Sequence, residues 1–216
     1  MYTGIQKSDK KSRAYVLHKG SCARVFFVWN YVKLFSCCNR CNVRVYALIP
    51  VQEAFHIHLN ANLQSFYSFV MEVARLSNSS DQIPMLVSER LMNVQESMEG
   101  KRLAVQGQFR SYNKHTGGKS KLLLSVFVRE WAPADPEDPR NPNSIFLDGF
   151  ICKKPMYRTT PLGREITDLL IAVNRPYNKS DYIPAIAWGR NAQYAARFGV
   201  GDRISLTGRL QSREYQ

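Results

Sequence analysis

An internal repeat constrains this chain more than any other feature. Residues 73–90 and 173–190 read VARLSNSSDQIPMLVSER and VNRPYNKSDYIPAIAWGR, and eight of their eighteen positions are identical. Residue usage alone predicts about one identity. With one inserted residue, the match continues from residues 100–107 to residues 201–208. A period of one hundred is far longer than the roughly 20–50 residues of a solenoid repeat, so the chain contains a duplicated domain.

Both copies show the same order of predicted elements. Alternating and apolar runs separated by polar turns predict strands, and a short helical stretch precedes the fourth strand. The order strand, strand, strand, helix, strand, strand is that of a five-stranded OB-fold barrel. We therefore predict an all-β protein of two tandem OB barrels, each with one short helix, the second lacking its last strand. The predicted strands are 45–51, 66–75, 83–87, 102–109 and 121–131 in the first copy, and 144–152, 166–175, 183–188 and 203–210 in the second.

The remaining segments set the domain boundaries. Residues 132–143 carry proline at every third position from 133 to 142, which favours a semi-rigid polyproline II linker. The first barrel is then 45–131 and the second 144–216. Residues 1–44 match neither copy and carry nine Lys or Arg against one acid, so we expect a basic tail outside the packed structure.

Charge distinguishes the two copies. The formal net charge is +13, but residues 45–144 hold ten Lys or Arg and ten acids, whereas residues 145–216 hold eleven and six. A basic surface indicates a polyanionic partner, such as nucleic acid. Only the second copy therefore has the charge expected of a nucleic-acid-binding domain.

Cysteine usage and hydropathy bear on the compartment and on metals. The odd number of cysteines favours a reducing compartment, and the apolar run 25–35 is too short and polar to span a membrane or to serve as a clean signal. We expect a cytoplasmic protein without a membrane contact. His18, Cys22, Cys38 and Cys41 are zinc-ligand types, but their spacing is loose and free thiols are the favoured interpretation, so we predict no metal and no cofactor.

The second copy resembles the bacterial single-stranded DNA-binding protein family. The resemblance is carried by RTTPLG (158–163), LIAVNR (170–175), DYIPAIAWGR (181–190) and GDRISLTGRLQSR (201–213). Two-unit chains of this kind look like a clostridial branch. The resemblance implies sequence-tolerant binding and protection of single-stranded DNA in replication, repair or recombination, and four barrels per assembly, hence a homodimer. Family members usually end in an acidic tip that recruits enzymes; no such tip precedes Gln216, so that recruitment is unsupported.

Binding of single strands requires exposed aromatic faces for the bases. Tyr182 and Trp188 lie six residues apart in one predicted strand and so share a face. Their counterparts in the first copy are Gln82 and Ser88, which rarely lie unpaired in an interior, so we expect both aromatics to be exposed. The resemblance adds two further stacking candidates. The predicted stacking residues are Tyr177, Tyr182, Trp188 and Tyr215.

The strand backbone also requires cations for its phosphates. Arg175 and Arg190 recur in the neutral first copy as Arg75 and Arg90, which indicates a structural pairing, with Asp81 and Asp181 as partners, and makes Arg190 a weaker candidate. The predicted phosphate contacts are Lys153, Lys154, Arg158, Arg164, Lys179, Arg190, Arg209 and Arg213.

Enzymatic activity and the binding of protein or RNA are the alternative classes of function. No catalytic triad, metal helix or nucleotide loop is recognisable, so we predict no enzymatic activity. The alternative to DNA binding is an OB-fold module for protein or RNA contact with little affinity for single-stranded DNA. The aromatic set discriminates, because stacking needs no 2′-hydroxyl.

Overall fold

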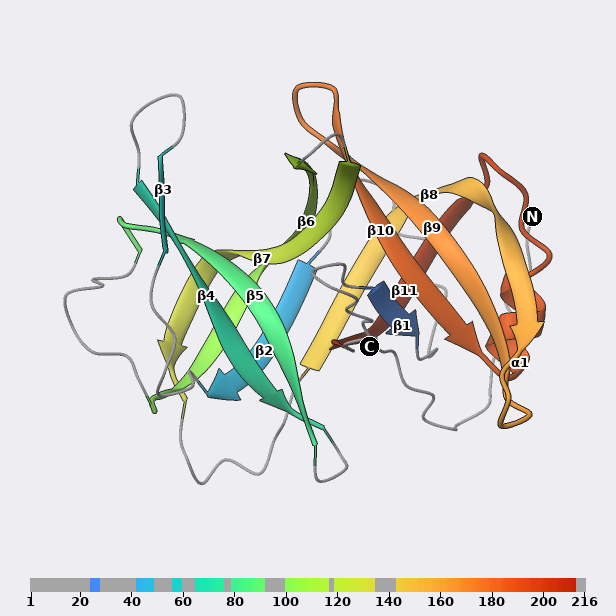
Figure 1. Ribbon diagram of the computed structural model, residues 1–216, viewed down its shortest axis with the longest axis horizontal. Coiled ribbons are helices and arrows are strands. Elements are labelled where there is room, and N and C mark those ends of the chain that lie inside the picture. The colour runs from blue at the N-terminus through green and yellow to red at the C-terminus, as the bar shows by residue number, and fades with distance from the viewer. Residues whose placement is uncertain are drawn as a thin grey trace, which may run out of the picture.

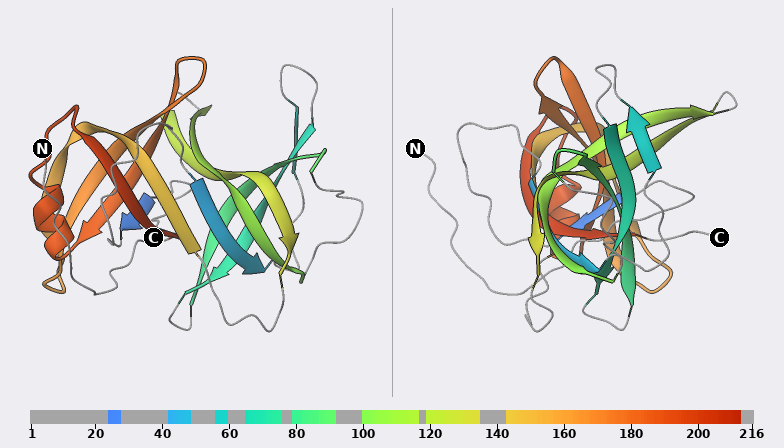
Figure 2. Two further views of the ribbon diagram at one scale, coloured as in Figure 1. Left: turned by 180° about the vertical axis from the view of Figure 1, so that it is seen from behind. Right: turned by 90° about the vertical axis from the view of Figure 1, so that its left-hand side faces the viewer.

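The fold is a pair of curled β-barrels side by side, as the computed structural model shows (Figures 1 and 2). All the strands of the described residues belong to one continuous sheet that curls into both barrels. No helix among these residues is long and apolar enough to cross a membrane. The structure describes residues 24–27, 42–48, 56–59, 65–75, 79–91, 100–116, 119–134 and 143–212.

The first barrel contains all five predicted strands, and its strands are β2 (Asn42–Leu48), β3 (His56–Leu59), β4 (Ser65–Ala74), β5 (Ser80–Ser88), β6 (Arg102–Thr116) and β7 (Lys119–Pro133). Its strands β5 and β7 run parallel, while β2 pairs antiparallel with β6 and meets β4 at its end. A short additional strand, β3, pairs with β4. The predicted helix of this barrel falls at residues 92–99, outside the described residues.

The second barrel contains its four predicted strands and its helix, as the repeat indicates. Its elements are β8 (Asn143–Thr159), β9 (Glu165–Arg175), β10 (Lys179–Trp188), α1 (Arg190–Ala195) and β11 (Arg203–Gln211). A strand from far upstream, β1 (Arg24–Phe27), lies between β10 and β11. We expected residues 1–44 to form a tail outside the packed structure, but residues 24–27 pair with the second barrel and β2 begins at Asn42. The other residues of 1–41 lie outside the described residues.

Alternation of side chains builds the core of both barrels. In β9, Ile171 and Val173 are buried, and in β10 the inward positions are Ile183, Ala185 and Ala187. Successive strand residues point to opposite faces, so this pattern leaves the even-numbered residues of β10 on the outer face. The outer face of β8, β9 and β10 is the surface on which the predicted binding residues fall.

Strands β2 and β8 join the two barrels. They pair antiparallel, with Val43 opposite Ile145. These two residues are equivalent in the repeat, because Val43 lies opposite Gly107 in the first barrel and Ile145 lies opposite Gly208 in the second. The same strand of each copy therefore meets its own counterpart, and the barrels are related by an approximate two-fold arrangement.

A second contact between the barrels involves Ser111 and Asp181. The backbone N–H of Ser111, on β6, donates to Oδ1 of Asp181 at 2.7 Å, and the N–H of Tyr182 donates to Oγ of Ser111 at 2.7 Å. Both Ser111 and Asp181 are buried. The first barrel therefore holds the start of β10 through two hydrogen bonds.

The equivalent contact exists in the opposite direction. The N–H of Ser212 donates to Oδ1 of Asp81 at 2.7 Å, and the N–H of Gln82 donates to Oγ of Ser212 at 2.7 Å. Ser212 corresponds to Ser111 in the repeat alignment, as Asp81 does to Asp181. We call these four residues the inter-barrel lock: Asp81, Ser111, Asp181 and Ser212.

Arginine side chains complete the lock. Arg75 contacts Asp81 at 2.6 Å and Arg175 contacts Asp181 at 2.8 Å, which confirms the structural pairing predicted for these two repeated arginines. Burial raises the pKa of Asp81 and of Asp181 above the usual value, and the neighbouring arginines oppose that rise. Arg75 and Arg175 therefore have a structural role as ion-pair partners of the two aspartates.

Candidate nucleic-acid interface

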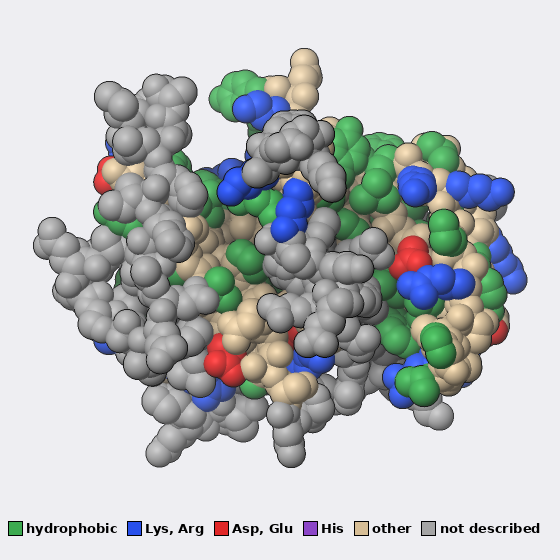
Figure 3. Space-filling view, in the orientation of Figure 1, with side chains coloured by type: hydrophobic (Ala, Val, Ile, Leu, Met, Phe, Trp, Pro, Cys, Tyr) green, Lys and Arg blue, Asp and Glu red, His purple; other side chains and the backbone are tan. Residues whose placement is uncertain are grey.

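The outer face of β8, β9 and β10 gathers most of the predicted binding residues. In an OB barrel the second and third strands, here β9 and β10, form the surface that binds oligonucleotides. On this barrel, at the right of Figure 3, Lys and Arg side chains are interspersed with hydrophobic ones. The face thus combines the two kinds of side chain that single strands require.

Tyr182 marks one end of the face. Its side chain is 44% exposed, as its correspondence with Gln82 indicated. Across the sheet, Tyr182 lies opposite Ala172, which in turn lies opposite Phe150. Phe150 is 36% exposed, so two accessible rings flank a small residue in one row. Sequence reasoning missed Phe150, although the two-residue alternation from Ile145 to Ile151 places it outward.

Trp188 marks the other end of the same face. It is half-buried and packs against the core, so the expectation that it is exposed is only partly met. The guanidinium carbon of Arg164 lies 5.9 Å from its ring centroid, within the range of a cation–π contact. Pro184 and Ile186, between Tyr182 and Trp188 on this face, are buried. The two aromatics therefore stand about 20 Å apart along the strand, as separate contact points.

Tyr177 lies in the turn between β9 and β10, which projects beyond the barrels in Figure 1. Its side chain is 94% exposed. The residue has φ 64°, and Asn178 has φ 54°, so two consecutive left-handed residues form the turn. That backbone holds the ring out into solvent. Tyr215, the fourth predicted stacking residue, lies outside the described residues.

Lys153 and Lys154 lie in an irregular part of β8. In a regular strand, adjacent side chains point to opposite faces, but both of these are exposed. The pairing of β8 with β9 shifts register between Ile151 and Lys153 and again between Lys153 and Met156. Such bulges re-aim side chains. The irregularity therefore presents two adjacent ammonium groups to solvent.

The other predicted cations divide into two groups. Arg158 lies in the same row as Trp188 and forms an ion pair with Asp168 at 2.7 Å, and Lys179 begins β10 beside the Tyr177 turn. By contrast, Arg190 begins α1 and Arg209 lies on β11, outside the three-stranded face. Arg213 lies outside the described residues. The face therefore brings together Lys153, Arg158 and Arg164, whereas Lys179, at the start of β10, has the alternation of Asp181 and not of Tyr182.

The first barrel presents a different surface. At the positions of Tyr182 and Trp188 it has Gln82, which is exposed, and Ser88, which is half-buried. Its ring Phe127 is covered by the guanidinium groups of Arg110 and Arg129, whose central carbons lie 3.9 and 5.1 Å from the ring centroid. Burial lowers the pKa of Arg110 to about 10. Both guanidinium groups contact the ring of Phe127. This ring is therefore covered, unlike the exposed rings of the second barrel.

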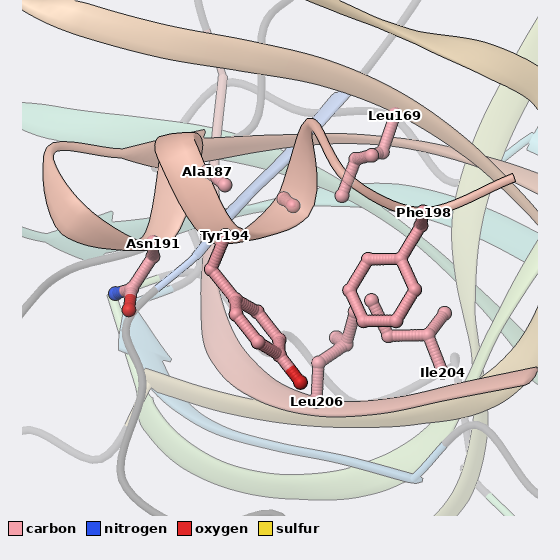
Figure 4. Close-up of a pocket in the computed structure, with 8 residues that line it drawn as sticks. Leu169, Ala187, Asn191, Tyr194, Phe198, Ile204 and Leu206 are labelled. Atoms are coloured by element: carbon pink, nitrogen blue, oxygen red, sulfur yellow. The ribbon is translucent and has the colours of Figure 1, made fainter.

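Helix α1 covers a small apolar pocket in the second barrel, shown in Figure 4. Tyr194 and Phe198 meet edge to face there, with ring centroids 5.2 Å apart. The hydroxyl of Thr167 donates to the carbonyl of Ala192 at 2.7 Å and fixes the helix to the barrel. The pocket belongs to the core beneath the helix, and its lining is Leu169, Ala187, Asn191, Tyr194, Ala195, Phe198, Ile204 and Leu206.

The candidate zinc ligands, His18, Cys22, Cys38 and Cys41, lie outside the described residues. Within the part of the chain that the structure describes, no group of three or more His, Cys, Asp or Glu side chains is placed to hold a metal ion.

The sequence comparisons with known proteins match the second barrel. The model of the single-strand binding protein family matches residues 142–216. The chain is 33% identical over 81 residues to single-stranded DNA-binding protein 2 of Streptococcus agalactiae, covering 34% of this chain and 62% of that protein. It is 33% identical over 81 residues to single-stranded DNA-binding protein A of Bacillus subtilis, covering 34% of this chain and 47% of that protein. The chain thus spans less than two thirds of the length of these relatives.

Solved structures share the fold of both barrels. The crystal structure of the wild-type single-stranded DNA binding protein from Thermus aquaticus matches with a TM-score of 0.59 at 17% identity, covering 81% of this chain and 89% of that chain. A deletion mutant of the same protein matches with a TM-score of 0.61 at 18% identity, covering 82% and 93%. These likenesses show the OB fold predicted from the sequence. Residues 142–216, which form the second barrel, are thus similar in sequence to single-strand binding proteins.

Proposed function

We propose that this protein binds single-stranded DNA without sequence preference and without catalysis, and that the second barrel makes the main contact. The observation that carries the proposal is Tyr182, an exposed aromatic on the third strand of a barrel that matches the model of the single-strand binding protein family. The position of Tyr182 is that of the oligonucleotide-binding face of OB folds.

The geometry supports different roles for the aromatic and the basic residues of this face. Tyr177, Tyr182 and Phe150 offer exposed rings on which bases of any sequence can stack, since every base has a π-face. Lys153 and Arg158 lie on the same face and would neutralise phosphates, and Lys179 would do so beside the Tyr177 turn. Trp188, partly in the core, would contribute a ring edge together with Arg164.

The number of barrels in one chain supports a proposal for the oligomeric state. One chain already pairs two barrels through β2, β8 and the inter-barrel lock. The second barrel's family resemblance implies a four-barrel complex, and two chains would supply it. We propose a homodimer, which sedimentation equilibrium tests directly: a particle of two chains supports it, and a monomer at micromolar concentration contradicts it.

A binding titration tests the proposed activity. Fluorescently labelled oligo(dT) of about 30 nucleotides would be titrated with the full chain at several salt concentrations, beside oligo(U) and duplex DNA of equal length. We expect tight binding of oligo(dT), affinity for oligo(U) no higher than that, and much weaker binding of the duplex. Preference for oligo(U), or no binding of either strand at low salt, would favour an RNA or protein partner instead.

A further inference from the structure

The first barrel shows how a barrel of this fold closes. Its last strand, β7, lies between the third and fourth strands, β5 and β6. It runs parallel to β5, with Val126 opposite Met85 and Phe127 opposite Leu86. It runs antiparallel to β6, with Phe127 opposite Gln108. A closing strand is therefore recognised by one parallel and one antiparallel neighbour.

In the second barrel, β1 has these neighbours in this order. It runs parallel to β10, with Val25 opposite Ala185 and Phe26 opposite Ile186. Ala185 and Ile186 are the repeat counterparts of Met85 and Leu86. Val25 and Phe26 therefore occupy the places that Val126 and Phe127 occupy in the first barrel.

The antiparallel side gives the same register independently. Phe26 lies opposite Arg209 and Phe27 lies opposite Gly208 on β11. Gly208 and Arg209 are the repeat counterparts of Gly107 and Gln108, which lie opposite Val128 and Phe127. Both neighbours thus assign Phe26 to the place of Phe127. The two strands also read alike, RVFF at 24–27 and SVFV at 125–128.

We propose that residues 24–27 are the closing strand of the second barrel, donated by a segment that precedes the first barrel in the chain. The second barrel is then built from two segments of the chain, one before the first barrel and one after it. The chain passes through the second barrel, forms the first barrel, and then returns to complete the second. The left view in Figure 2 shows β1, in dark blue, among the strands of the second barrel. The segment that we expected to be a tail becomes part of the fold.

The strand also positions the candidate interface. The N–H of Tyr182 donates to Ser111 and so points away from β9. Backbone groups in a ladder alternate in direction, so the N–H of Ile186 points away from β9 as well, toward β1. Pro184, between them, has no N–H to offer. Hence β1 is the neighbour that fixes the outer edge of β10 between Tyr182 and Trp188.

A disulfide test reads the register directly. In the full chain with its five cysteines changed to serine, Phe26→Cys is combined with Arg209→Cys; opposite residues of antiparallel strands lie about 4.5–5.5 Å apart at Cα, which suits a disulfide. The control combines Phe26→Cys with Ser205→Cys, four residues along β11 on the same face, about 13 Å away. We expect an intrachain disulfide in the first pair only. Equal cross-linking in both pairs, or cross-linking between chains, would overturn the proposal.

Amide exchange provides a second readout that does not need an engineered disulfide. Phe26→Pro removes a ladder N–H and blocks pairing, so the amide of Ile186 should exchange roughly tenfold faster or more. The amide of Leu86, its counterpart beside β7, should be unchanged, and Ala14→Pro should change neither. Unchanged exchange at Ile186 in the Phe26→Pro variant would refute the assignment. Neither measurement involves nucleic acid, so their outcome is independent of the proposed function.

Discussion

The inter-barrel lock makes a quantitative prediction about two serine hydroxyls. Ser111→Ala removes the acceptor of the Tyr182 N–H, and Ser212→Ala removes the acceptor of the Gln82 N–H, both at 2.7 Å. The backbone N–H groups of both serines remain, so their bonds to Asp181 and Asp81 are retained. Each substitution therefore deletes that hydrogen bond between the barrels, and Ser212→Ala also deletes the 3.5 Å contact from its hydroxyl to Oδ1 of Asp81.

The expected cost follows from the burial of the site. Ser111 and Ser212 are 8% and 9% exposed, so a donor that loses its acceptor there regains little water. Leaving such a donor unsatisfied costs about 1–3 kcal/mol. The two hydroxyls have no hydrogen-bond partner in common, so the double variant should lose about 2–6 kcal/mol of unfolding free energy. The reciprocity of the lock predicts similar losses for the two single variants.

Urea unfolding followed by tryptophan fluorescence measures these losses, because Trp131 and Trp188 report on different barrels. Ser180→Ala is the control: its hydroxyl donates to Asn174 at 3.0 Å in an exposed position, so its effect should stay within about 0.5 kcal/mol. If Ser111→Ala and Ser212→Ala were as mild as this control, the hydrogen bonds of the lock would not hold the barrels together and the reasoning would fail.

Three further predictions concern pH, packing and salt. Hydrogen bonding to Arg203 lowers the pKa of Asp148. This carboxylate therefore stabilises the fold above its unfolded pKa near 3.8, and its contribution disappears as the pH falls through the folded pKa. In urea titrations between about pH 5 and pH 3, the Asp148→Asn variant should lose less unfolding free energy than the parent. A Cβ on Gly149 would collide with the carbonyl oxygen of Ala172, so Gly149→Ala should cost about 1–3 kcal/mol, and an unchanged thermal midpoint would contradict this. Lys153→Ala should reduce the slope of log affinity against log salt for oligo(dT) by about 0.7 if the ammonium contacts one phosphate, whereas an equal slope would remove Lys153 from the interface.

The repeat made much of this fold predictable. Comparison of two copies located the strands, placed Tyr182 on an outer face through its counterpart Gln82, and identified Arg75 and Arg175 as structural. Such inferences work because alternation and substitution patterns report which side of a strand faces water. Each copy serves as a comparison for the other wherever both form regular strands.

Other features could not be read from local pattern. The pairing of residues 24–27 with strands more than 150 positions away depends on register between distant segments, which a four-residue apolar run does not specify. The half-burial of Trp188 depends on what packs against it, and Ser88 at the same place is itself half-buried. The outward aim of both Lys153 and Lys154 depends on a bulge, since regular alternation would direct one of them inward.

The most direct test of the account is the affinity of Tyr182→Ala for oligo(dT), measured beside Gln82→Ala at the equivalent place in the first barrel. The N–H of Tyr182 that joins the lock is a backbone group, so the substitution removes the ring and keeps the lock. One stacked base is worth about 1–3 kcal/mol, so affinity should fall about 5- to 150-fold, while Gln82→Ala binds like the parent. A folded Tyr182→Ala variant with parental affinity would contradict the claim that the second barrel binds single strands by stacking on β10.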